Sequence, residues 1–264
     1  MNARHKWQRT LPLVALLAAL VPALSVSLSP RRAALLAAPT AQVRVPFRAG
    51  ETLDYRVAWA AFSSAASLEL TVPERRDLFG RQTWHLRATG HTVNTVRSLF
   101  AIDDESDSYS DVATLESRQY EIHLNDLGKK EDQIVHFAPT GQASRAPAPV
   151  VMVPPGTYDP LGALYALRGV DWQGTPEFRI PVCDGHDVYQ MAAKVAAFGE
   201  SVTVDKGTFT TTHISIRVFE TSGKELPENH FDMWLAADPT RTPVKMQAQL
   251  PIGTLRVQLT SATQ

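Results

Sequence analysis

YDPLGALYALRG, residues 158–169, carries the signals of a helix with both ends marked. Asp159 belongs to the residue types that accept a hydrogen bond from a free backbone N–H of the first helical turn. Pro160 suits the first helical position, where its missing N–H costs nothing. Gly169 is suited to the left-handed conformation that ends many helices. The sequence therefore predicts a helix between these residues, in a chain that otherwise shows strand and turn patterns.

One face of this helix must be covered by apolar partners. Leu161, Leu164, Tyr165 and Arg168 fall at positions i, i+3, i+4 and i+7, and this spacing places them on one side of a helix. Arg168 lies on that apolar side near the C-terminal end, where a guanidinium needs a carboxylate, free carbonyl groups or a ligand anion. We expect the sheet to cover this face, with a structural ion pair for Arg168.

The rest of the chain repeats apolar residues with period two, which is typical of strands with one buried face. Leu53, Tyr55, Val57 and Trp59 form the first such run. Further runs occupy residues 66–72, 84–88, 118–124, 132–136, 178–182, 189–195, 208–219, 230–235, 244–250 and 255–259. Residues 94–100 favour a single helical turn, and the Pro-rich residues 138–157 are interpreted as a crossover.

These elements predict a mainly β protein with a large antiparallel curved sheet or incomplete barrel and one capping α-helix. Residues 47–264 are expected to form a single β domain. The alternative is two smaller sheets divided at the Pro-rich crossover.

The N-terminal residues predict export. Basic residues precede the apolar run 11–24, and this is the layout of a secretory signal peptide over residues 1–27, followed by a linker over 28–46. Cleavage is expected after Ser25 or Ser27, and the second apolar patch at residues 33–38 leaves a longer or uncleaved leader as the alternative. The mature chain is expected in the periplasm or cell envelope without a transmembrane anchor. No cysteine lies near the cleavage region, so a lipoprotein anchor is not expected, and Cys183 has no partner for an internal disulfide. Without residues 1–27, 23 basic and 27 acidic side chains remain, which argues against nucleic acid as a partner.

Four stretches carry a family resemblance: VPFRAGETLDYRVAW at 45–59, VPPGTYDPLGALYALRG at 153–169, RIPVCDGHDVY at 179–189 and TRTPVKMQAQLPIGTLRVQLTS at 240–261. In order and spacing they resemble the bacterial family called domain of unknown function 3108. The resemblance implies an exported, mostly β envelope protein and implies no reaction.

The acidic run 103–111 admits three interpretations. It lacks the glycine of a calcium loop, and the sequence alone does not place two of its carboxylates across a sugar as a glycosidase requires. A solvated strand edge is the preferred interpretation. The histidines show no zinc spacing, and no nucleophile motif is present. We therefore expect no catalytic residue, no metal and no cofactor.

Together these observations predict a non-enzymatic protein that binds an amphipathic lipid or a glycan on a concave sheet face. The residues chosen as ligand contacts are Arg168, Tyr165, Tyr109, Trp59 and Asp104. The alternatives are an enzyme that acts on envelope polysaccharide through carboxylates of the acidic run, and a structural partner of an outer-membrane assembly. The sequence leaves the oligomeric state open.

Overall fold

The computed structural model describes residues 45–140, 149–250 and 253–263. The expected signal peptide and most of the expected linker lie outside these residues. The helices are α2 Asn94–Leu99 and α3 Pro160–Gly169. The strands are β1 Thr52–Trp59, β2 Phe62–Leu78, β3 Arg81–Thr92, β4 Asp103–Asp111, β5 Ser117–Asp126, β6 Lys129–Pro139, β7 Val150–Val153, β8 Glu177–Cys183, β9 Val188–Val204, β10 Gly207–Glu220, β11 Glu225–Ala236, β12 Pro243–Leu250 and β13 Gly253–Thr263.

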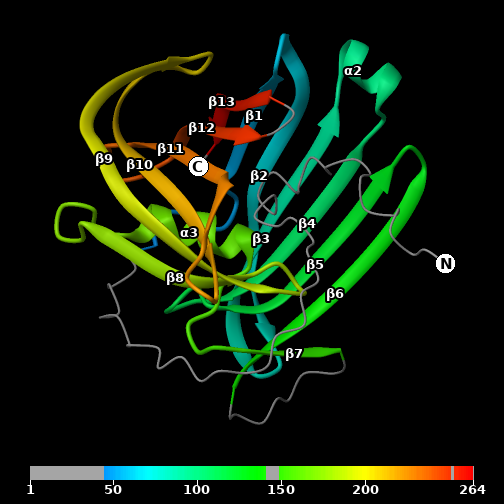
Figure 1. Ribbon diagram of the computed structural model, residues 1–264, viewed down its shortest axis with the longest axis vertical. Helices are drawn as coiled ribbons and strands as arrows, with labels where there is room; N and C mark the ends of the chain where they lie inside the picture. The colour runs from blue at the N-terminus through cyan, green and yellow to red at the C-terminus, as the bar shows by residue number, and fades with distance from the viewer. Residues whose placement is uncertain (1–44, 141–148, 251–252, 264) are drawn as a thin grey trace.

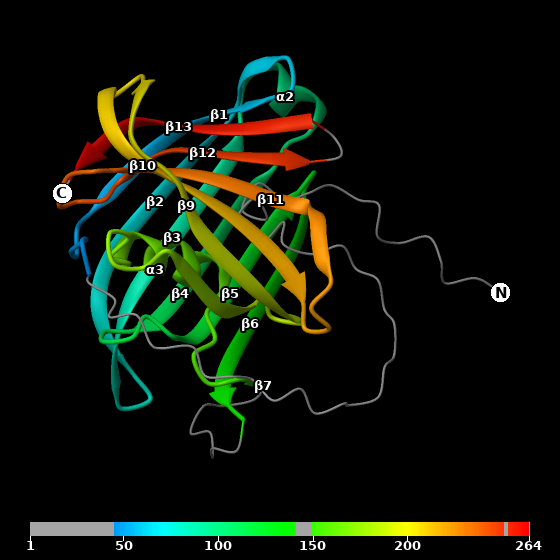
Figure 2. The same ribbon diagram turned by 60° about the vertical axis from the view of Figure 1, so that its left-hand side comes forward.

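All thirteen strands belong to one sheet in the order β7-β6-β5-β4-β3-β2-β1-β13-β12-β11-β10-β9-β8. Neighbours pair antiparallel, except β6 and β7, which pair parallel. The sheet curls so that strands β9 to β12 face strands β2 to β5, with α3 between them (Figures 1 and 2). The expected mainly β fold, a curved antiparallel sheet with a capping helix, is confirmed.

The segment before α3 connects strands from opposite arms of the sheet. Ser117 of β5 donates its N–H to the Thr157 carbonyl (3.1 Å). The next residue, Tyr158, donates to the Pro181 carbonyl (3.0 Å) and accepts from the Cys183 N–H (2.8 Å), both on β8. The two bonds of Tyr158 thereby pair backbone groups of β8, which is an edge strand of the sheet. The chain enters α3 already fixed to both arms of the sheet.

Helix α3 is buried on all sides and not on one face only. Each of its ten residues is buried, because the sheet curls around it. The Asp159 side chain caps the first turn by accepting from the Gly162 N–H (2.8 Å), as predicted. At position 162 a side chain would be crowded, since a Cβ there would lie 3.0 Å from the hydroxyl oxygens of both Ser110 and Ser117. This glycine lets the helix approach β4 and β5 closely.

The C-terminal end of α3 differs from the prediction. Gly169 is the last helical residue, and Val170 (φ −68°, ψ 135°) ends the helix in an extended conformation. The prediction that Gly169 adopts the left-handed conformation is therefore wrong. Two side chains satisfy the last carbonyl groups instead, with Trp172 Nε1 donating to the Leu167 carbonyl (3.1 Å) and Arg241 donating to the Val170 carbonyl.

The acidic run 103–111 is an interior strand and not an edge. It forms β4, which pairs with β3 and β5, so the expectation of a solvated edge is wrong. Asp103, Glu105, Asp107 and Asp111 share one face of the strand and are paired with arginines. Asp104 is buried on the other face and accepts from the Asn125 N–H (3.2 Å). Arg97 binds Asp103 (2.7 Å) and Arg118 binds Asp111 (3.2 Å). The crossover region also differs in detail, because it contains the short strand β7.

Candidate functional site

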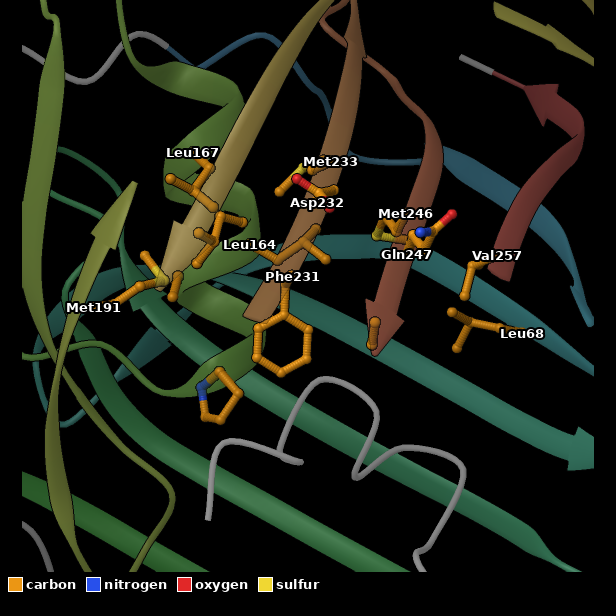
Figure 3. Close-up of a pocket in the computed structure, with 14 residues that line it drawn as sticks. Leu68, Leu164, Leu167, Met191, Phe231, Asp232, Met233, Met246, Gln247 and Val257 are labelled. Carbon is orange, nitrogen blue, oxygen red and sulfur yellow. The ribbon is translucent and has the colours of Figure 1, made fainter. Parts of the chain in front are cut away.

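A groove runs along the inner side of α3. Pro160, Leu164 and Leu167 lie at i, i+4 and i+7 of the helix, with Ala163 beside them, and they form one wall. The opposite wall consists of inward-facing residues of β9 to β13 and β2. Figure 3 shows Leu164 and Leu167 on the helix side and Met233 and Met246 on the strand side. Side chains return to the same face every 3.6 residues along the helix and every 2.0 residues along the strands, and these two periods bring the residues of each wall together.

The groove is apolar along almost its whole length. Its strand wall carries the apolar residues Leu68, Met191, Ile216, Phe231, Met233, Met246, Ala248 and Val257, and the polar residues Asp232 and Gln247. The free space inside this hollow measures about 90 Å³, and the hollow is open to solvent on one side. Among its apolar lining residues, Phe231 and Met246 are only partly buried.

Methionine is concentrated in this wall. Three of the five methionines of the chain, Met191, Met233 and Met246, line the groove. Met233 and Met246 are cross-strand partners of β11 and β12. Flexible thioether side chains adapt to ligands of irregular shape, and they are frequent on surfaces that bind varied apolar partners. The wall therefore suits an apolar chain better than a rigid polar molecule.

A polar cluster fixes the N-terminal end of the helix wall. The Asp159 carboxylate accepts from the hydroxyl groups of Ser108 (2.5 Å) and Ser117, and the Ser117 hydroxyl in turn accepts from the Asp159 N–H (2.7 Å). Burial raises the pKa of Asp159, and the hydrogen bonds offset part of this rise. The three side chains are buried and saturated with mutual bonds, so they position α3 and the groove.

A buried ion pair holds the other end of α3. Arg168 donates to both carboxylate oxygens of Glu51, at 2.6 and 3.0 Å, and to the Thr240 carbonyl at 3.2 Å. Both charged side chains are 0% exposed. The guanidinium also lies over the rings of Phe47 (5.4 Å) and Tyr165 (5.1 Å). Burial opposes the charge of Arg168, but the Glu51 carboxylate raises its pKa above the usual value.

The structure brings together two of the five residues chosen from the sequence. Tyr165 and Arg168 are neighbours on α3, and both are fully buried. Tyr109 stacks on His85 on the outer face of the sheet (ring centroids 4.8 Å apart). Asp104 is buried on β4, and Trp59 ends β1. A ligand role for these residues remains a prediction, since the groove is lined by others.

Sequence reasoning missed most of the groove residues. Their signal was present, because Met191, Ile216 and Val257 occupy inward positions of predicted strands. Period two cannot distinguish an inward residue that packs against a neighbour from one that borders a hollow. Glu51 was also missed, because nothing in the sequence pairs it with a residue 117 positions away.

The fold and groove define a class: a mainly β protein whose single curved antiparallel sheet encloses one buried helix and an apolar groove. Within this class the chain belongs to the family of proteins of unknown function DUF3108, whose family model matches residues 54–260. A search of the curated proteins gives no match. No described helix has both the length and the apolar character needed to span a membrane.

Three solved structures match the chain at low sequence identity and with TM-scores below 0.5. A β-barrel-like protein of domain of unknown function DUF1849 from Brucella abortus is 10% identical, with a TM-score of 0.47 over 80% of this chain and 96% of that chain. A candidate lipoprotein from Parabacteroides distasonis is 12% identical, with a TM-score of 0.37 over 84% of this chain and 99% of that one. A candidate exported protein with a YmcC-like fold from Bacteroides fragilis is 9% identical, with a TM-score of 0.33 over 85% and 100%.

Proposed function

We propose that this protein is an exported, non-enzymatic binding protein of the cell envelope that holds the apolar chain of a lipid in the groove beside α3. The observation that carries the proposal is the groove itself, with its largely apolar lining and its partly exposed side chains Phe231 and Met246. Burial of an acyl chain there gains about 0.8 kcal/mol for each CH₂ group. Export is supported by the signal-peptide pattern of residues 1–27.

The apolar lining favours a lipid over a glycan. The hydroxyl groups of a sugar lose their bonds to water in such a groove, and each unpaired polar group costs roughly 1–3 kcal/mol. The helix wall is also rigid, because Asp159 and Arg168 anchor its two ends. A preformed wall lowers the ordering cost of binding.

The arrangement of carboxylates gives less support to polysaccharide hydrolysis. Adjacent acids of β4 alternate between the faces of the sheet, so Asp104 is buried while its neighbours Asp103 and Glu105 are more exposed. The outer acids are paired with Arg97 and Arg87. The binding proposal therefore rests on the groove and not on this strand.

The test is native mass spectrometry of the protein purified from the periplasm, followed by titration of the delipidated protein with a fluorescent long-chain fatty-acid analogue. We expect a lipid-sized adduct and saturable binding. Met246→Trp places a larger side chain in the groove and is expected to weaken probe binding at least tenfold. Gln249→Trp is the matched control, because it lies on the same strand and is exposed. It is expected to leave binding unchanged.

Three results would overturn the proposal. A ligand-free mass together with no probe binding would show that the groove does not hold a lipid. A co-purified glycan identifies the other ligand class. Equal loss of binding in the Met246 and Gln249 variants shows that the probe adheres to the surface and not to the groove. Circular dichroism of both variants shows whether each retains the β fold.

A further inference from the structure

A second cluster lies on the outer face of the sheet, away from the groove. Asp107 of β4 is the cross-strand partner of Glu121 of β5, and His123 follows two residues later on the same face. One carboxylate oxygen of each acid and one ring nitrogen of the histidine lie within 4.8 Å of one another. Two strands therefore bring an N,O,O set of metal-ligand atoms together.

The orientation of His123 matches that of a metal-ligating histidine. Its Nδ1 lies 2.7 Å from Asp132 Oδ1 on β6, the next strand. A carboxylate that accepts a hydrogen bond from Nδ1–H fixes the tautomer of the ring. In that tautomer Nε2 carries the lone pair that can bind a metal. That Nε2 lies 3.6 Å from Glu121 Oε2, close to the roughly 3.4 Å that separates two ligands of a tetrahedral zinc ion.

The charges around the cluster also favour a cation. Asp107 and Glu121 are like charges directly opposite each other, which destabilises a strand pair. The Asp107 side chain is only 2% exposed, so water screens it little. Glu105 lies opposite His123, which adds a further carboxylate. A bound divalent cation relieves this repulsion.

Two groups offset part of the negative charge. Arg87 donates to Asp107 Oδ1 (2.8 Å) and lies 3.4 Å from Glu105, while His85 also binds Asp107 Oδ1. Both of these bonds use Oδ1 of Asp107, so we assign Oδ2 as the atom that would bind a metal. An imidazole with two carboxylates suits zinc and similar first-row metals better than calcium or magnesium, which prefer all-oxygen sites.

We propose that Asp107, Glu121 and His123 form a binding site for a divalent first-row transition metal of the zinc class, with Asp132 orienting the histidine. Water completes the coordination on the exposed side, since His123 and Glu121 are partly open to solvent. The site is independent of the lipid groove, because it lies on the opposite face of the sheet.

Isothermal titration with Zn²⁺ and metal analysis after gel filtration test the site. Hydrogen bonds to Asp132 and Glu121 raise the pKa of His123, so the titration is done at about pH 8, where the metal competes with fewer protons. We expect one Zn²⁺ per chain. His123→Ala and Glu121→Gln are expected to weaken binding at least tenfold, and Asp132→Asn by about 10- to 100-fold through loss of orientation.

His213→Ala is the matched control. His213 also lies between two carboxylates, Asp232 (2.9 Å) and Glu200 (3.5 Å), but its ring stacks on Trp234. Zn²⁺ affinity is expected to be unchanged in this variant. No stoichiometric binding by the unaltered protein, an equal loss in the His213 variant, or full affinity in Glu121→Gln would each overturn the proposal. Asp132 is 71% exposed, so its variant gives a result even where a buried change disturbs folding.

Discussion

Replacing Glu51 by Leu removes the carboxylate that neutralises Arg168, and we expect a large loss of stability. Both side chains are fully buried and share two hydrogen bonds, at 2.6 and 3.0 Å. The guanidinium left behind keeps the Thr240 carbonyl and two aromatic rings as partners. None of these carries a full negative charge.

The structure sets the size of the effect. Breaking a buried ion pair by removing one partner costs about 3–5 kcal/mol, because the other charge stays buried without compensation. Arg168→Met is expected to cost a similar amount, because it leaves the Glu51 carboxylate buried without its cation. The double variant Glu51→Leu with Arg168→Met removes both desolvated charges, so it is expected to be more stable than either single variant. The loss of about 3–5 kcal/mol is large against the 5–15 kcal/mol typical of whole proteins.

Urea unfolding followed by tryptophan fluorescence and circular dichroism measures all four proteins. Coincident transitions from the two signals permit a free energy of unfolding for each. The double-mutant cycle then gives the coupling energy, which is expected to exceed about 2 kcal/mol. Single variants that each lose less than about 1 kcal/mol, or a double variant whose loss equals the sum, would refute the reasoning. Either result shows that the pair does not anchor α3.

Two further changes test the packing of α3 and the acidic strand. Gly162→Ala is expected to lower the unfolding free energy by about 1 kcal/mol despite the higher helix propensity of alanine, because the new Cβ meets the Ser117 hydroxyl at 3.0 Å; a higher urea midpoint would contradict this. Burial raises the pKa of Asp107, but hydrogen bonds from His85 and Arg87 lower it by more, so the pKa of Asp107 in the folded protein lies below its usual value. The stability it contributes is therefore present above the unfolded pKa and is lost as pH falls through the lower folded value. Asp107→Asn is expected to remove this contribution, so that thermal melts between about pH 5 and pH 2 show a smaller fall than in the parent; an unchanged fall would count against it.

Local sequence signals predicted the elements well. Asp159 and Pro160 mark the start of α3, and the alternation of Leu53, Tyr55 and Val57 marks β1. These signals act between residues a few positions apart, so they can be detected without knowing the fold. The end of α3 was not predicted, because Arg241 and Trp172 supply the cap from outside the helix.

The candidate sites depended on contacts across long sequence distances. His123 has no zinc-binding spacing in the sequence, and its group forms only because β4, β5 and β6 are paired in a particular register. The same holds for the groove, where Met191 and Met246 come from separate strands. Period two gives each side chain a face of the sheet, but register decides which side chains meet across it.

The sequence by itself determined the β character, the place and start of the helix, and the family. The tertiary structure alone decided that α3 is enclosed on every side, that Arg168 is paired with Glu51, and that the acidic run is an interior strand. The physical reason is the curl of the sheet, because curvature joins strands from distant parts of the chain around one helix. Local propensities carry no information about that closure, whereas burial, charge pairing and the groove all follow from it.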